Sequence, residues 1–182
     1  IQELVRSLAD YLRYMVRGNF TLVPFEDELK HVQTYLQIQK IRSGENLICH
    51  IDADQQLMSL RMPPLILHTF IENIVKHALT MYEPIKVFIK AAVIEQENGK
   101  YASITIQDSG KGFAAEALDH INSDNVHHKD DGVSIGIWNI KQRLMLMYGN
   151  KASVTASNND GARIQIILPI EMEPIQNEYS NR

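Results

Sequence analysis

Four short segments carry polar or flexible residues at places where a plain scaffold does not need them. They are ENIVKHA at 72–78, DSGKG at 108–112, GVSIGIWN at 132–139 and DGA at 160–162. Amides, carboxylates and closely spaced glycines are groups that can meet a metal ion, a nucleobase or a phosphate. These four segments are therefore the candidates for chemistry in this sequence.

The first segment places three polar side chains on one stripe of an expected helix. Asn73, Lys76 and His77 are three and four residues apart, so they share a helical face. An amide oxygen can ligate a hard cation and an ammonium can meet a phosphate, so the stripe suits a metal–phosphate ligand. The alternative is an exposed ion pair between Glu72 and Lys76, with the other two groups solvated, and the segment taken alone favours it.

The second segment joins a carboxylate to a flexible turn. Asp108 ends an expected strand, where its side chain could accept a hydrogen bond from an exocyclic amine such as that of adenine. Gly110 and Gly112 allow positive φ and a close approach of the backbone to a ligand. A β-turn is the simpler interpretation, because Asp-Ser-Gly is a common turn sequence. The segment at 160–162 is likewise a hairpin turn by default and indicates nothing alone.

The third segment places glycines at the start of an expected helix. Gly132 and Gly136 flank this start, where free backbone N–H groups and the helix dipole favour an anion. Glycine within a helix costs about 1 kcal/mol relative to alanine, so close packing or ligand approach should compensate at Gly136. The segment is neither a Walker A loop, since no G-K-S/T closes it, nor a dinucleotide fingerprint, since no strand leads into it.

The elements that must position these segments follow from hydrophobic periodicity and turn residues. The pattern predicts helices over 1–17, 25–42, 65–80, 114–121 and 134–149, and strands over 46–52, 85–95, 100–108, 151–157 and 162–170. The polar segment 122–132 is predicted to be a mobile loop that could act as a lid. We expect an α+β fold in which three helices cover one face of a mixed, mainly antiparallel five-stranded sheet.

Composition limits the class of protein. The 182 residues, 45% of them hydrophobic, can bury the core of one compact domain. The formal net charge of -4 gives no support to a sequence-independent nucleic-acid binder, so no nucleic-acid partner is expected. The single cysteine, Cys49, cannot form an internal disulfide and is expected to be a buried structural thiol. No apolar run approaches the roughly 20 residues that span a bilayer, and the chain begins at Ile1, like a piece of something longer.

In this order and spacing, the four segments resemble the N, G1, G2 and G3 boxes of the GHKL superfamily of ATP-binding domains, which histidine kinases, gyrase, Hsp90 and MutL share. Within it, the chain resembles the catalytic part of a LytS-like sensor histidine kinase. The residues that carry this likeness are VPFEDELKHVQTYLQIQKIR, MPPLILHTFIENIVKHAL and SIGIWNIKQRLMLMYG. The resemblance covers residues 8–169.

The resemblance implies a Bergerat-type two-layer α/β sandwich. Residues 19–170 would be the ATP-binding catalytic domain, and residues 171–182 a C-terminal tail. Residues 1–18 would be the C-terminal part of a dimerisation and phosphoacceptor helical region.

The resemblance also implies a role for each candidate residue. Asn73 would hold the Mg²⁺ that bridges the phosphates of ATP, with Lys76 and His77 beside the phosphate chain. Asp108 would bind the adenine amine. The remaining implied positions are Gly110 and Gly112 beside Asp108, Gly132, Gly136 and Asn139 near the phosphates, and Gly161 and Ala162 at the floor near the adenine. The sequence departs from the family pattern at Ser109, where many relatives have Asn, at Ala162, where Thr is frequent, and in Val133-Ser134-Ile135-Gly136-Ile137.

The expected activity is that of a histidine protein kinase. The γ-phosphate of ATP would pass to a histidine outside this sequence, and then to an aspartate of a response regulator. The resemblance implies a homodimer and a cytoplasmic domain attached to the membrane only through a preceding region. Without the phosphoacceptor histidine, the chain is not expected to autophosphorylate alone; His31 is interpreted as an exposed surface histidine rather than the acceptor.

Two other functions remain open. One is an ATP hydrolase of the gyrase, Hsp90 or MutL kind, but such proteins carry a water-activating glutamate where this chain has Thr69. Glu72 is about 100° around the helix from Asn73, so it is poorly placed to take over the role of that missing glutamate. The other is a degenerate domain that binds nucleotide or only a partner. A metal site at His127 and His128 is a weaker alternative to a solvated lid.

Overall fold

The computed structural model describes residues 9, 12, 22–43, 46–77, 84–123 and 132–171. Most of the expected helix 1–17, with the boundary at residue 18, lies outside the described residues. So do residues 124–131 of the expected lid and the tail from residue 172.

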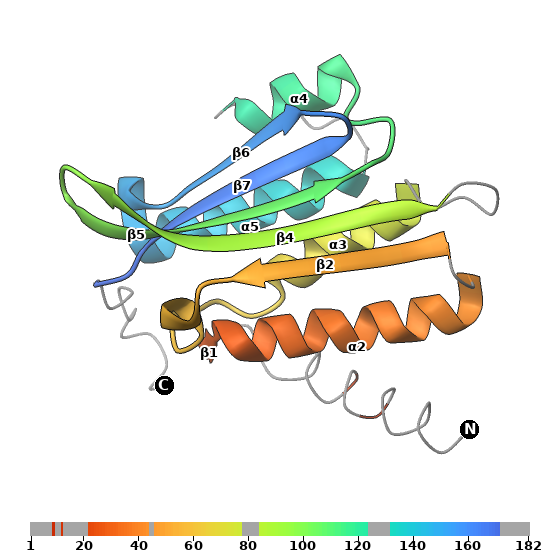
Figure 1. The fold of residues 1–182 in the computed structure, drawn as a ribbon. Helices are drawn as coiled ribbons and strands as arrows, with labels where there is room; N and C mark the ends of the chain where they lie inside the picture. The colour runs from red at the N-terminus through yellow and green to blue at the C-terminus, as the bar shows by residue number, and fades with distance from the viewer. Residues whose placement is uncertain are drawn as a thin grey trace, which may run out of the picture.

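The centre of the fold is a five-stranded sheet in the order β2-β4-β5-β7-β6 (Figure 1). Its strands are β2 (Leu47–Ala53), β4 (Ile85–Gln96), β5 (Gly99–Asp108), β6 (Ser153–Asn158) and β7 (Ala162–Pro169). β2 and β4 pair in parallel, and every other pair is antiparallel. The expected mixed, mainly antiparallel sheet is confirmed, and its described boundaries lie within two residues of those predicted.

Four helices pack with this sheet: α2 (Phe25–Ser43), α3 (Ile66–His77), α4 (Ala115–Asn122) and α5 (Gly132–Tyr148). In Figure 1, α3 and α5 lie behind the sheet, α2 runs along β2, and α4 lies beside β6. Short 3-10 turns, η2 (Gln55–Leu57) and η3 (Gly149–Lys151), follow β2 and α5. No helix within the described ranges is long and apolar enough to cross a membrane.

A second, two-stranded sheet was not expected. It pairs β1 (Val23–Pro24) with β3 (Arg61–Met62) in antiparallel fashion. Two residues are too few to show the alternation that identifies a strand in a sequence. This small sheet ties the entrance of α2 to the loop that leads into α3.

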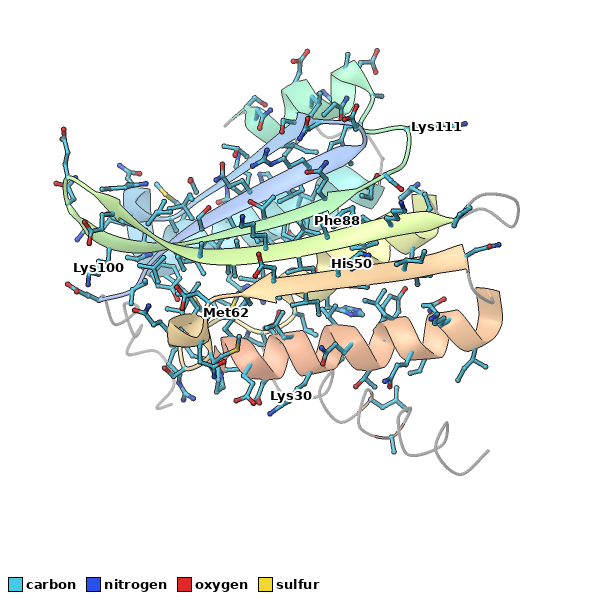
Figure 2. All side chains as sticks on the ribbon, in the orientation of Figure 1. Lys30, His50, Met62, Phe88, Lys100 and Lys111 are labelled. Atoms are coloured by element: carbon cyan, nitrogen blue, oxygen red, sulfur yellow. The ribbon has the colours of Figure 1, made fainter. Side chains whose placement is uncertain are left out.

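The core lies between the sheet and the helices. Ile89 pairs with Ile106, and Ile106 pairs with Ile164, so their side chains form one row across the sheet. All three are buried, and burying an isoleucine side chain contributes roughly 1.5–3 kcal/mol. The other face of the sheet is open, and Phe88 stacks there on His50 with ring centroids 5.3 Å apart (Figure 2).

Candidate functional site

The carboxylate of Asp108 is fixed at the end of β5. It lies two residues after Ile106 and four after Ile104, so its side chain points to the same, helix-covered side of the sheet and is buried. Its Oδ1 accepts hydrogen bonds from the backbone N–H groups of Gly110 at 2.7 Å and Ala162 at 3.2 Å. None of the described residues donates to Oδ2, so this second oxygen can accept from a ligand.

Gly161 packs directly on the backbone of Asp108. A Cβ at residue 161 would overlap the Asp108 carbonyl oxygen, and its φ of +138° is one that side chains rarely adopt. Only glycine fits this position without strain. The structure thus brings together Asp108, Gly110, Gly161 and Ala162, which the sequence places in two distant segments.

Two contacts hold the loop that follows Asp108. Gly112 has a φ of +78°, and a Cβ there would lie 2.6 Å from Oδ1 of Asn158. The Asn158 side chain accepts from the N–H of Phe113 at 2.8 Å and donates to its carbonyl at 2.9 Å. On the other side, Ser109 Oγ accepts from the N–H of Lys86 at 3.0 Å. Sequence analysis missed Asn158, because its turn segment gave no sign of a distant partner.

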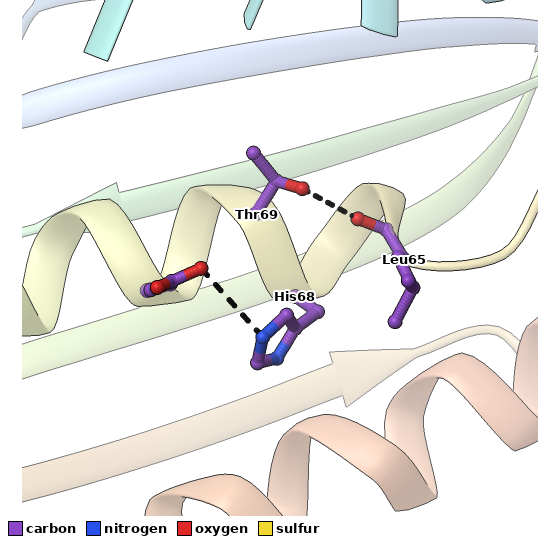
Figure 3. A network of polar contacts seen from close by, with 4 residues as sticks. Leu65, His68 and Thr69 are labelled. Carbon is purple, nitrogen blue, oxygen red and sulfur yellow. Dashed lines mark hydrogen bonds and ion pairs between the residues drawn. The ribbon is translucent and has the colours of Figure 1, made fainter. Parts of the chain in front are cut away.

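Helices α3 and α5 run antiparallel and touch at a glycine. A Cβ at Gly136 would lie 3.1 Å from Cγ2 of Thr69, while Arg143, later in α5, donates from Nη2 to the carbonyl of Pro64 at 2.8 Å. The Thr69 hydroxyl donates to the carbonyl of Leu65, one turn earlier, at 2.7 Å (Figure 3). Close helix packing is therefore the compensation expected for Gly136.

Asn73 lies one turn beyond Thr69 on the same face of α3. Because the two helices are antiparallel, it lies toward the first turn of α5, which begins at Gly132. Its Nδ2 is fully buried, and no described residue pairs with it. A buried polar group left unpaired costs about 1–3 kcal/mol, so this amide calls for an external partner.

The amide and the helix end suit complementary parts of a ligand. The Asn73 side chain also carries an amide oxygen, a group that can ligate a hard cation. The N-terminus of α5, a 17-residue helix, favours an anion. Lys76 and His77 are exposed in the last turn of α3, where they add cationic or hydrogen-bonding groups.

Two further residues of α5 differ in their surroundings. Asn139 is exposed, and no described contact fixes its side chain. Arg143 is half-buried and donates to the carbonyl of Pro64, so it supports the start of α3. The pKa of Arg143 is lowered overall, because the effect of burial exceeds the opposing effect of the negative charge of Glu28.

The expectation that His31 is an exposed surface residue was wrong. It is 4% exposed and packs on His68, with ring centroids 4.9 Å apart. The ring of Tyr35 also packs on the imidazole of His68. Burial, followed by the neighbouring His68, lowers the pKa of His31 to about 4. The residue therefore belongs to the core between α2 and α3. His127 and His128 lie outside the described residues, and no metal-binding cluster occurs among those that are described.

Comparisons with known proteins show which family the sequence matches. A model of the histidine kinase family matches residues 1–47, and a model described as histidine kinase-, DNA gyrase B- and HSP90-like ATPase matches residues 63–172. The chain is 29% identical over 174 residues to the sensor protein LytS of Oceanobacillus iheyensis, covering 92% of this chain and 29% of that protein. It is 28% identical over 178 residues to the sensor histidine kinase YesM of Bacillus subtilis, covering 96% of this chain and 29% of that protein. The chain thus spans less than a third of these relatives.

Solved structures share the fold. The catalytic domain of the histidine kinase ThkA superposes with a TM-score of 0.59 at 14% identity, covering 84% of this chain and 97% of that one. The histidine kinase AdeS of Acinetobacter baumannii gives a TM-score of 0.58 at 16% identity, covering 93% and 77%.

Proposed function

Because the chain belongs to the histidine kinase-, DNA gyrase B- and HSP90-like ATPase family, we propose that it is the ATP-binding catalytic domain of a sensor histidine kinase. The observation that carries this proposal is the buried, unpaired amide of Asn73 beside the N-terminus of α5. In this proposal the carboxylate of Asp108, whose Oδ1 is held by Gly110 and Ala162, would form the second wall of the same site.

Each wall takes one end of the nucleotide. Asp108 accepts a hydrogen bond from the adenine amine, and Gly161 lets the base approach the backbone. Lys76, His77 and the start of α5 neutralise the phosphates. Asn73 is the residue that would hold Mg²⁺, an ion that neutralises charge on the phosphates when bound.

Phosphoryl transfer to a protein histidine is favoured over ATP hydrolysis. The position of a water-activating glutamate is taken by Thr69, whose methyl group packs against Gly136 and whose hydroxyl is bonded to Leu65. Glu72 lies 3.8 Å from Nε2 of His68, on the side of α3 that faces α2. No described carboxylate on α3 is therefore placed to activate water beside Asn73.

The rest of the proposal concerns the longer protein. The γ-phosphate would go to a histidine outside this sequence, and then to a response regulator. Residues 1–18 would belong to the dimerisation region of a homodimer, and residues 19–170 would be the catalytic domain. The domain would act on the cytoplasmic side of a membrane, to which a preceding region attaches it.

Calorimetry with Mg-ATP tests the nucleotide site. The unmodified chain should bind, and Asn73→Ala and Asp108→Ala should each weaken binding at least about tenfold, or 1.4 kcal/mol. Absence of binding by the unmodified chain at millimolar nucleotide would remove the main support for the proposal.

A labelling experiment separates kinase from hydrolase. The longer protein should be incubated with γ-labelled ATP and tested for acid-labile, base-stable phosphate on the protein. Steady release of phosphate without labelled protein would favour hydrolysis.

A further inference from the structure

The first turn of α3 is capped by a side chain from another helix. Glu28 of α2 accepts hydrogen bonds from the N–H of Leu65 at 2.6 Å, on Oε1, and from the N–H of Leu67 at 3.0 Å, on Oε2. The Glu28 side chain is fully buried. The free N–H groups at a helix start usually bond to a serine, threonine or aspartate of the same segment. Here that role falls to a carboxylate 37 residues earlier in the chain.

The local sequence cannot supply this cap. Pro63, Pro64 and Leu65 precede the helix, and none has a side-chain oxygen. Leu65 also has a φ of +65°, a conformation that costs a non-glycine residue about 1–3 kcal/mol unless its surroundings hold it. The start of α3 therefore depends on Glu28.

Other bonds tie the same corner to its neighbours. Arg143 of α5 donates to the carbonyl of Pro64 at 2.8 Å. The N–H groups of Phe25 and Glu26, at the start of α2, bond to the carbonyls of Leu60 at 2.8 Å and Met58 at 3.1 Å. The beginning of α2 is therefore bonded both to the loop that leads into α3 and, through Glu28, to the first turn of α3 itself.

The capped helix carries the residues of the proposed site. Thr69 lies one turn after Leu65, and Asn73 lies two turns after it, about 12 Å along the axis at 1.5 Å per residue. Glu28 lies within residues 1–47, which match the histidine kinase model, while α3 lies within residues 63–172, which match the ATPase model. The Glu28 contact thus joins the two matched segments directly.

We propose that Glu28 is a positioning residue of the nucleotide site, through which α2 sets the position of Asn73. This regulatory role rests on the proposed function of the site. A movement of the N-terminal segment is passed through Glu28 to the metal and phosphate wall, while the adenine wall is held separately by β5 and β7. The affinity for the phosphate end of the nucleotide therefore follows the position of α2.

The test compares Glu28→Gln with Glu26→Gln in the 182-residue chain. Both variants lose one negative charge from the first turn of α2, but Glu26 is exposed and pairs with Lys30 at 2.7 Å. The glutamine at 28 keeps the shape of the side chain, yet offers one acceptor oxygen to two N–H groups. Unfolding curves for both variants establish that they are folded.

Two readouts distinguish positioning from general stability. The side-chain amide signals of Asn73 in nuclear magnetic resonance spectra should shift in Glu28→Gln and stay in place in Glu26→Gln. Binding of Mg-ATP should weaken by about fivefold or more in Glu28→Gln, within the usual range of coupling between sites. Binding of adenosine, which carries no phosphates, should change by less than about twofold, because the adenine wall is intact.

Unchanged Asn73 signals in a folded Glu28→Gln variant would overturn the proposal, as would equal weakening of Mg-ATP and adenosine binding. If the unmodified chain does not bind Mg-ATP, the proposed function fails, and the Asn73 signals still decide whether Glu28 positions α3. Should Glu28→Gln not fold, Arg143→Lys replaces it, since lysine keeps the charge and loses the planar group bonded to Pro64. Its Asn73 signals should also shift, and unshifted signals would count against the proposal.

Discussion

Gly161 lies so close to the carbonyl oxygen of Asp108 that no side chain fits between them. Gly161→Ala should therefore both destabilise the fold and abolish nucleotide binding. The expected loss is about 2 kcal/mol or more, because the strain of the backbone adds to the overlap. Gly99→Ala is the matched control, since Gly99 has a similar φ of +128° with nothing within 4 Å of an added Cβ. Equal losses in urea unfolding would show that the overlap contributes nothing.

Asp108→Asn should change which base the site prefers. The Oδ1 bonds to Gly110 and Ala162 can be kept by the asparagine oxygen, while Oδ2 becomes an N–H donor. A donor repels the amine of adenine and suits the carbonyl of hypoxanthine. We expect ATP affinity to fall about tenfold or more, with ITP losing less. Competition binding measures the affinities for ATP and ITP. Asp160→Asn, in the adjacent turn, should leave the ratio of these two affinities unchanged.

Gly136→Ala should cost nucleotide affinity without stabilising the fold. Alanine is favoured over glycine in a helix by about 1 kcal/mol, but its Cβ would press on Cγ2 of Thr69 at 3.1 Å. Thr69→Ser removes that methyl group and keeps the hydroxyl bonded to Leu65. The double variant should regain stability and affinity, with a coupling of about 0.5–3 kcal/mol in a double-mutant cycle. Additive effects would contradict the contact.

The buried imidazole of His31 should make the fold sensitive to acid. Its pKa is lowered to about 4 in the folded state from the ordinary value of 6.5, so the unfolded state binds the proton more readily. The contribution of the neutral His31 to the free energy of unfolding is complete above about pH 6.5. It is lost as the pH falls toward 4, by at most about 1.4 kcal/mol per pH unit. In urea unfolding, the difference in the free energy of unfolding between pH 7.5 and pH 5.0 should be smaller for His31→Leu than for the unmodified chain. His50→Leu, on the open face of the sheet, should keep the full difference.

Local patterns predicted the secondary structure well. The alternation in Ile104 and Ile106 and the turn before Lys100 predicted the hairpin of β4 and β5, because period and turn chemistry are properties of neighbouring residues. The stripe of Asn73, Lys76 and His77 was likewise visible as spacing. Their roles at the site remain predictions, which the calorimetry tests.

Contacts between distant segments could not be predicted in the same way. Acidic residues in the first turn of a helix usually interact with the dipole of that helix, yet Glu28 of α2 caps α3 instead. Arg143 of α5 likewise donates to the carbonyl of Pro64, 79 residues earlier in the chain. Each pairing depends on how two helices cross, and no spacing within either helix encodes that crossing.

The parallel pairing of β2 with β4 has a consequence for synthesis on the ribosome. β4 with β5, and β6 with β7, are hairpins whose partners emerge within a few residues of each other. β2 emerges first, and β4, its partner among the described strands, follows after the whole of α3. Until then its apolar residues, among them Leu47 and Ile51, have no sheet to pack on. A nascent chain that stalls before Ile85 would expose them, so this stretch is where we expect a chaperone to bind during translation.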